Sequence, residues 1–212
     1  MQKNKNSKQN ITSELTEQQQ KTVRLVYRTS LVPVFILTIL YIFKIIPNWV
    51  ISVYIISFLL CAFGWEIWFT YGIWGGLSVN DRRPKALNRA IPQNINWILN
   101  SLADAASICL VGLLLVWAFY GFNLTPFTSW HWGAFTILFV WFVGQNIYVE
   151  AIVYRDQLDE EKPLSWGPLS PGGPWWNPTV FKINGQAIKF QTQIPWVLMT
   201  PIFYWAVLIL VR

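Results

Sequence analysis

Charged residues are scarce in this sequence, and their scarcity argues against a soluble protein. Asp, Glu, Lys and Arg make up 12% of the 212 residues, whereas a soluble domain carries about a quarter charged residues. The charges that are present gather in short stretches, and long apolar segments lie between them. The net charge of +6 therefore does not indicate nucleic-acid binding, because basic residues beside apolar segments are typical of membrane topology signals.

The sequence also lacks the residues and motifs of several common chemistries. His131 is its one histidine, which excludes the histidine clusters of membrane desaturases and hydroxylases and leaves haem with few candidate ligands. No P-loop, dinucleotide fingerprint or nucleophile motif occurs. Cys61 and Cys109 lie in apolar segments, where we expect buried thiols rather than a disulfide. We therefore predict no metal and no cofactor.

Apolar segments of membrane-spanning length dominate what is present. A span needs roughly 20 mostly apolar residues. The sequence predicts an all-α, polytopic transmembrane helix bundle that forms a single domain over residues 23–212. A polar tail at 1–22 precedes it, and we expect this tail to be disordered and cytoplasmic. The five predicted spans cover about 31–46, 49–74, 96–120, 131–154 and 194–211.

Lys and Arg predict how these spans are oriented. Six basic residues lie in or just after the tail and four lie between the second and third spans, whereas the opposite loops have almost none. The positive-inside rule then places the N terminus in the cytoplasm and Arg212 outside. The sequence does not indicate which membrane contains the protein.

The segment 155–192, between the fourth and fifth spans, carries its own structural signal. Residues 179–190 contain two β-type runs around Asn184-Gly185. Asn-Gly is a strong hairpin signal, because a type I′ turn needs positive φ at both central positions. We therefore predict a cytoplasmic loop that contains a short β-hairpin. This loop is either a cap on the helix bundle or a lid over a lipid-facing site.

Acidic residues occur inside three of the predicted spans. An ionised carboxylate in mid-membrane costs at least about 2.5–3.5 kcal/mol, so such residues usually face the bundle interior and have a function. Glu66 lies in the second span, Asp104 in the third and Glu150 near the end of the fourth. At about 1.5 Å per residue, Glu66 and Asp104 both lie about 12–14 Å below the predicted cytoplasmic boundary.

Uncharged polar residues accompany the acids at a similar depth. Asn96, Asn100, Asp104 and Ser107 are spaced by four, four and three residues, which places them on one face of a helix. The predicted catalytic residues are Glu66 and Asp104. The predicted substrate-binding residues are Asn100, Gln145, Asn146, Trp65, Tyr148, Glu150 and Thr200.

Proton transfer is the chemistry that these residues favour. An apolar setting favours the neutral form of a carboxyl group, which can then act as a general acid. Aromatic rings stabilise nearby cations, and several of the 14 Trp residues adjoin the acids. An acid and an aromatic lining together suit the protonation of an alkene. Aromatic residues are, however, also ordinary core and lipid-facing residues of membrane helices.

Short motifs resemble two known families. The five-span layout, Trp65-Glu66-Ile67-Trp68-Phe69, an acid in the third span and the segment 143–148 resemble the emopamil-binding, sterol Δ8–Δ7 isomerase (EXPERA-like) family. That resemblance implies Glu66 and Asp104 as acid and base in a membrane pocket where a double bond shifts, with Gln145 and Asn146 as polar groups. The family's histidine ahead of the second-span glutamate has no counterpart here. Residues 61–66 are similar to the Trp-Glu element of membrane-bound meroterpenoid cyclases, which implies Glu150 as a second acid.

We therefore predict an integral-membrane acid/base enzyme of lipid metabolism, an isomerase or a terpene cyclase, that acts on an isoprenoid or sterol-like lipid. Its predicted partners are the lipid bilayer and a hydrophobic small-molecule substrate, and not a nucleic acid. Two alternatives stay open. One is a non-catalytic lipid-binding or assembly protein in which the polar residues bond the helices together. The other is a small proton-coupled carrier. The sequence does not predict an oligomeric state.

Overall fold

Long apolar helices make up most of the computed structural model, which describes residues 15–73, 77–153, 177–183 and 185–211. Within these residues, five helices are long and apolar enough to cross a membrane. They confirm the five predicted apolar segments as helices. Their bounds are Glu17–Ile42, Asn48–Tyr71, Gln93–Phe119, Trp132–Val153 and Phe190–Leu210.

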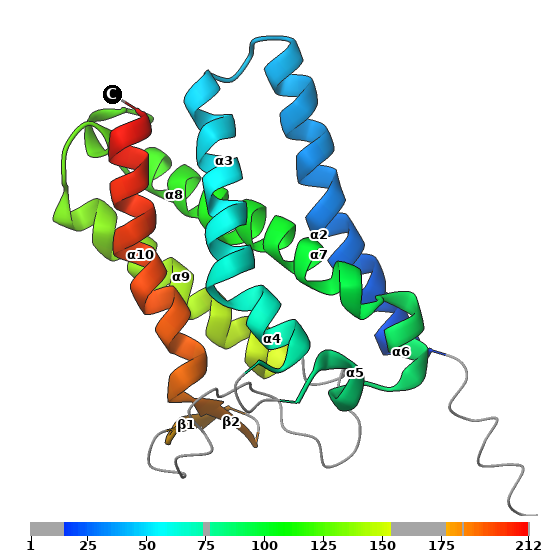
Figure 1. Cartoon of the computed structure of the whole chain (residues 1–212). Helices are drawn as coiled ribbons and strands as arrows, with labels where there is room; N and C mark the ends of the chain where they lie inside the picture. Colours follow the sequence, from blue (N-terminus) through cyan, green and yellow to red (C-terminus); the bar gives the residue numbers. More distant parts are fainter. Residues whose placement is uncertain (1–14, 74–76, 154–176, 184, 212) are drawn as a thin grey trace, which may run out of the picture.

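Successive long helices run in alternating directions between the two ends of a single bundle (Figure 1). α2 (Glu17–Ile42) and α3 (Asn48–Cys61) form a helical hairpin, and the helix that joins α7 (Gln93–Asp104) to α8 (Val111–Phe119) crosses both obliquely. α2 packs along α7. α9 (Trp132–Tyr148) packs along α10 (Phe190–Leu210).

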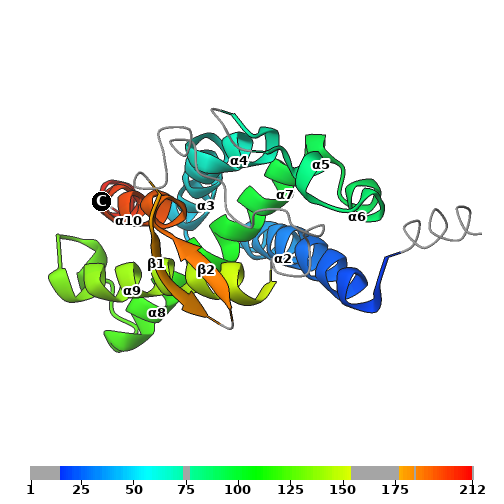
Figure 2. The same cartoon turned by 90° about the horizontal axis from the view of Figure 1, so that it is seen from below.

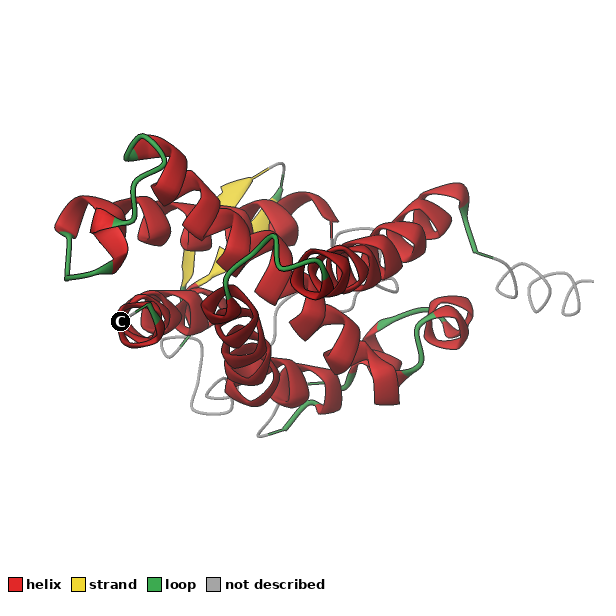
Figure 3. Cartoon of the chain, turned by 90° about the horizontal axis from the view of Figure 1, so that it is seen from above, coloured by secondary structure: helices red, strands yellow, loops and turns green. Residues whose placement is uncertain are grey.

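The two ends of the bundle differ in what covers them. Figure 3 shows one end, with the α2–α3 and α8–α9 connections and the C-terminal end of α10. Figure 2 shows the opposite end, where α4 (Ile67–Tyr71), α5 (Val79–Arg82), α6 (Lys85–Ala90) and the two β-strands lie. The acids of the second and third helices lie toward this second end.

Three of the five long helices contain a π-helical segment. These segments are Ala62–Glu66 (η1) between α3 and α4, Ala105–Leu110 (η2) between α7 and α8, and Val149–Val153 (η4) after α9. In η1 the N–H of Ile67 donates to the carbonyl of Ala62, five residues back. A π turn contains one residue more than an α turn, so it rotates the side chains that follow it onto a different face. Such turns are frequent at functional sites.

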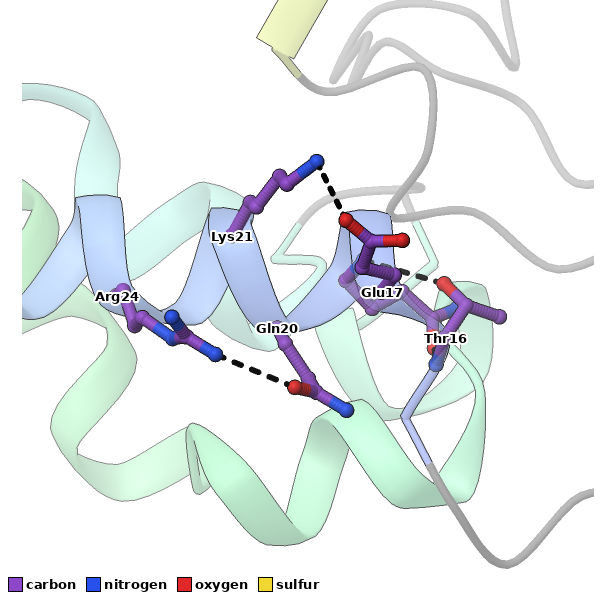
Figure 4. A network of polar contacts seen from close by, with 6 residues as sticks. Thr16, Glu17, Gln20, Lys21 and Arg24 are labelled. Carbon is purple, nitrogen blue, oxygen red and sulfur yellow. Dashed lines mark hydrogen bonds and ion pairs between the residues drawn. The ribbon is translucent and has the colours of Figure 1, made fainter.

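α2 begins at Glu17, so the predicted disordered tail was wrong for residues 17–22, which are helical. Thr16 and Gln19 form a capping box, in which each side chain accepts a hydrogen bond from the other residue's backbone N–H at 3.1 Å. The carboxylate of Glu17 also forms an ion pair with Lys21 at 2.8 Å (Figure 4). These local contacts start the helix well before its apolar segment.

Contacts with α6 and α7 hold the first half of α2 in place. Ser30 is fully buried, and its hydroxyl donates to the carbonyl of Leu99 at 2.6 Å. The hydroxyl of Tyr27 donates to the carbonyl of Ala90 at 3.0 Å. Because these bonds are tertiary, hydropathy alone could not predict them.

The loop predicted between the second and third spans folds as α5 and α6. Arg82 and Arg83, which we had interpreted as topology signals, are 2% and 6% exposed. The guanidinium of Arg82 donates to the carbonyl of Phe69 at 2.9 Å and lies 3.9 Å from the centroid of the Phe69 ring. Arg82 therefore fixes α5 against the end of α4.

The predicted β-hairpin is confirmed. β1 (Thr179–Ile183) and β2 (Gln186–Lys189) are antiparallel, and Ile183 pairs with Gln186, so the turn has two residues. Gly185 has φ +82°, as a type I′ turn requires. Asn184 and residues 154–176 lie outside the described residues, so the distinction between cap and lid stays a prediction.

Candidate functional site

Glu66 lies at the interface between η1 and α7. It is the last residue of η1 and is 6% exposed. Its Oε2 accepts a hydrogen bond from Nδ2 of Asn100 at 3.0 Å. The sequence placed these two residues at a similar depth, and the hydrogen bond brings them into contact.

A second polar pair lies one helical turn away. Nδ2 of Asn96 donates to Oγ1 of Thr70 at 2.9 Å, and both residues are buried. Thr70 follows Glu66 by four residues, and Asn96 precedes Asn100 by four, so the two pairs are successive rungs between antiparallel helices. We call Glu66–Asn100 and Thr70–Asn96 the polar ladder.

Arg83 holds the outer end of the polar ladder. Its Nη1 donates to Oδ1 of Asn96 at 2.9 Å, its Nε donates to Oδ1 of Asn88 at 3.1 Å, and its Nη2 donates to the carbonyl of Ile91 at 3.0 Å. The bond from Arg83 fixes which amide atom Asn96 presents to Thr70. Sequence reasoning missed this role, because a basic residue beside a span is usually a topology signal.

Asp104 continues the polar face of α7 beyond the ladder. It follows Asn100 by one turn and is half-buried. The indole Nε1 of Trp65 donates to Oδ2 of Asp104 at 3.3 Å, a contact that the sequence did not predict. Ser107 does not extend the network, because its hydroxyl donates to the carbonyl of Ala103 in its own helix at 2.5 Å.

The charge environment of these two acids is unusual. Among the described residues, the hydrogen bonds that Glu66 and Asp104 accept come from the uncharged side chains of Asn100 and Trp65. The buried guanidinium of Arg82 acts on Glu66 through space, without an ion pair between them. An ionised carboxylate that is buried without a directly bonded cation is costly. The arrangement thus differs from a structural ion pair, and it suits groups that gain and lose protons.

A second polar cluster surrounds Glu150, the acid near the end of the fourth long helix. Glu150 is 6% exposed and is bonded within the bundle, which the sequence did not indicate. Asn146 donates to its Oε1 at 3.4 Å, and Nε2 of Gln193 donates to its Oε2 at 3.2 Å. Nδ2 of Asn146 also donates to Oε1 of Gln193 at 2.9 Å. We missed Gln193 because α10 begins at Phe190, earlier than the predicted fifth span.

An aromatic contact joins the two clusters. The rings of Trp65 and Trp196 lie 4.7 Å apart between centroids, and Trp196 is 3% exposed. Phe142 meets the Trp196 ring edge-on at 5.6 Å. Thr200, predicted to bind substrate, is fully buried but donates to the carbonyl of Trp196 in its own helix at 2.8 Å. Thr200 therefore lies behind the aromatic residues rather than beside an acid.

Gln145 and Tyr148 lie apart from both clusters. We had predicted that Gln145 and Asn146 share the pocket, but adjacent residues on an α-helix point about 100° apart. Asn146 faces α10, whereas Gln145 and Tyr148 line an outward groove beside α8. Tyr148 is 55% exposed. The structure thus brings Asn146 to Glu150 and leaves Gln145 on the surface.

The three acids Glu66, Asp104 and Glu150 each lie in or beside a π-helical segment. Glu66 ends η1, Asp104 immediately precedes η2, and Glu150 is the second residue of η4. This coincidence was not predicted from the sequence. A π turn changes the helical phase where a carboxyl group must face the bundle interior, and it is typical of functional sites.

A large apolar cavity lies between α2, α3 and the η2–α8 helix. Its volume is about 890 Å³, and its wall is almost entirely hydrocarbon, including Leu37, Trp49, Leu110 and Trp117. Ala106 and Ser107, which follow Asp104 closely in the chain, also line it, together with further residues of α2 and α3. The cavity is large enough for part of a lipid molecule.

Within the described residues, no group of three or more His, Cys, Asp and Glu side chains could hold a metal ion. His131 lies near the α8–α9 connection, where its Nδ1 is 2.8 Å from the hydroxyl of Tyr120, at the opposite end from the acids.

The chain matches no known family model, and no curated protein or solved structure is significantly similar to it.

Proposed function

We propose that this chain is a multi-pass integral membrane protein that catalyses acid/base chemistry on an isoprenoid or sterol-like lipid. One observation carries the proposal: Glu66 and Asp104 lie at the same helix interface, and the side chains that donate hydrogen bonds to them among the described residues are uncharged, with no ion pair to either acid. Structural carboxylates are usually paired with cations. The N terminus is then cytoplasmic and the C terminus outside, because the basic residues lie at the end of the bundle that contains α5 and α6.

The reaction that fits these residues is a proton shift within the lipid. Glu66, in its acid form, gives its proton to one carbon of a double bond. Asp104, oriented by Trp65, takes a proton from a neighbouring carbon, so the double bond moves or a ring closes without any change in oxidation state. The Trp65–Trp196 pair supplies aromatic faces that stabilise the intermediate carbocation.

The apolar cavity supports a hydrophobic substrate. Its volume of about 890 Å³ and its hydrocarbon wall suit an isoprenoid chain or a sterol-like ring system rather than a polar metabolite. Ala106 and Ser107 place one side of the cavity within a turn of Asp104 along η2.

Isosteric substitutions separate chemistry from structure in this site. Glu66→Gln keeps an oxygen that accepts from Asn100 but cannot give up a proton, and Asp104→Asn keeps an acceptor for Trp65. We expect untargeted lipidomics of deletion and complemented cells to reveal a lipid that changes with the wild-type gene and not with either variant. Glu150→Gln is the matched control, since it alters the second cluster in the same manner. Full turnover of that lipid by purified Glu66→Gln protein would refute the proposal.

The polar ladder favours one alternative, a non-catalytic lipid-binding or assembly protein. Its two rungs join antiparallel helices in the way that interhelical amide bonds do in membrane bundles. In this case Glu66→Gln retains function, because the bond to Asn100 persists, whereas Glu66→Leu destabilises the bundle. The pair of variants thus distinguishes the two functions.

A further inference from the structure

Gln145 is a polar residue inside the fourth long helix. It lies in α9, about 12 Å from the nearer end of its long helix. Neither of its amide atoms has a hydrogen-bond partner in the part of the chain that the structure describes, and no further interaction of this side chain occurs. Asn146, the next residue, is bonded to both Thr192 and Gln193. A free side-chain amide at hydrocarbon depth is costly, so Gln145 favours a hydrogen-bond partner from beyond the described residues.

A groove beside Gln145 has room for that partner. Its volume is about 580 Å³, and it lies between α8 and α9. Thr136, Val140, Gly144 and Tyr148 follow at intervals of four along its wall, which places them on one face of the helix. A Cβ added to Gly144 would meet no atom within 4 Å, so another backbone can approach closely here.

We propose that this groove binds α9 of a second copy of the same chain, with the two Gln145 amides hydrogen-bonded across a two-fold axis. A two-fold interface places a residue against its own copy near the axis. Each Gln145 amide can then bond to the amide of the other copy, because the group carries both a donor and an acceptor. A lipid acyl chain fills the groove equally well but offers no hydrogen bond at this depth. The two half-buried, unbonded amides therefore favour a homodimer over a lipid as the occupant.

Cysteine cross-linking tests the geometry. Cys61 and Cys109 are fully buried and give little background. Val140→Cys places a thiol on the proposed interface, and Leu198→Cys, at a similarly exposed position on α10, is the matched control; the two native side chains are 64% and 57% exposed. In liposomes that contain the purified full chain, we expect copper–phenanthroline to give a disulfide-linked dimer with Val140→Cys and none with Leu198→Cys.

Substitution of Gln145 tests the energetic basis. We expect Gln145→Leu to weaken dimerisation by roughly three- to thirtyfold, measured by energy transfer between labelled copies at varied protein-to-lipid ratios. Gln145→Asn should retain most of the association. The fold is not at risk, because leucine suits a lipid-facing position. A chain that is monomeric at every ratio, equal cross-linking at both cysteine positions, or unchanged dimerisation of Gln145→Leu would each overturn the proposal.

Discussion

Lys44 occupies a backbone position that normally belongs to glycine. It lies just after α2 with φ +55°, in the left-handed region. The N–H of Ile45 donates to the carbonyl of Leu40 at 2.9 Å, and the N–H of Lys44 donates to that of Tyr41 at 2.9 Å. These two bonds define a Schellman motif, whose left-handed residue is usually glycine. Lys44 is exposed, so no tertiary contact requires its side chain.

We predict that Lys44→Gly stabilises the protein. A left-handed conformation costs an L-residue about 1–2 kcal/mol, and glycine avoids that cost. Glycine also gives the unfolded chain more conformational freedom, which lowers the free energy of unfolding by about 0.4–1 kcal/mol. The net gain in the free energy of unfolding is therefore about 0.5–1 kcal/mol. Lys44→Ala is the control, because it removes the ammonium group but keeps the Cβ.

The opposite substitution, from glycine to alanine, can be made at the left-handed position that follows α8. Gly121 has φ +65°, and the N–H of Phe122 donates to the carbonyl of Trp117 at 2.8 Å, in the same motif. A Cβ at Gly121 would meet no atom within 4 Å, so Gly121→Ala imposes backbone strain alone. We expect it to lose about 1 kcal/mol. Reversible unfolding in mixed micelles measures all three variants. Equal stability of Lys44→Gly and Lys44→Ala would refute the reasoning.

Further predictions concern the ladder, its anchor and the hairpin. Asn100→Leu removes the side chain that donates to buried Glu66 and should lower the free energy of unfolding by about 1–3 kcal/mol. The double variant with Glu66→Leu should recover most of that loss, which a double-mutant cycle in micelles will measure. Arg83→Lys cannot reproduce the three-way fork of bonds and should lower the thermal midpoint, while Lys85→Ala on the exposed side of α6 should leave it unchanged. Gly185→Ala, at φ +82°, should weaken the hairpin by about 1 kcal/mol, seen as faster hydrogen exchange of β1 and β2 amides.

The sequence predicted the features that depend on local pattern. Long apolar segments predicted five helices, and Asn-Gly predicted the hairpin. The four-residue spacing of Asn96, Asn100 and Asp104 predicted a common face, which the bonds to Thr70, Glu66 and Trp65 confirm. Each of these signals lies within one continuous segment of the chain, so it can be recognised without knowledge of the tertiary contacts.

The features that sequence reasoning missed depend on contacts between distant segments. α9 is apolar on every side, so its sequence did not indicate whether Asn146 or Gln145 faces α10. The π turns change helical phase, and no composition signal marked them in advance. Arg83 is buried because Asn88, Asn96 and the Ile91 carbonyl surround it, which only the folded arrangement of α5 to α7 creates.

The polar ladder has a consequence for how α4 and α7 align. Its two rungs are four residues apart on both helices, so sliding one helix by a single turn brings new residues opposite each other. In one direction Glu66 comes opposite Asp104, and two carboxyl groups meet. In the other direction Thr70 comes opposite Pro92, whose ring donates no hydrogen bond. Of these three registers, only the native one forms both hydrogen-bonded pairs. These few polar side chains therefore specify the register of two helices whose apolar surfaces would pack in several registers.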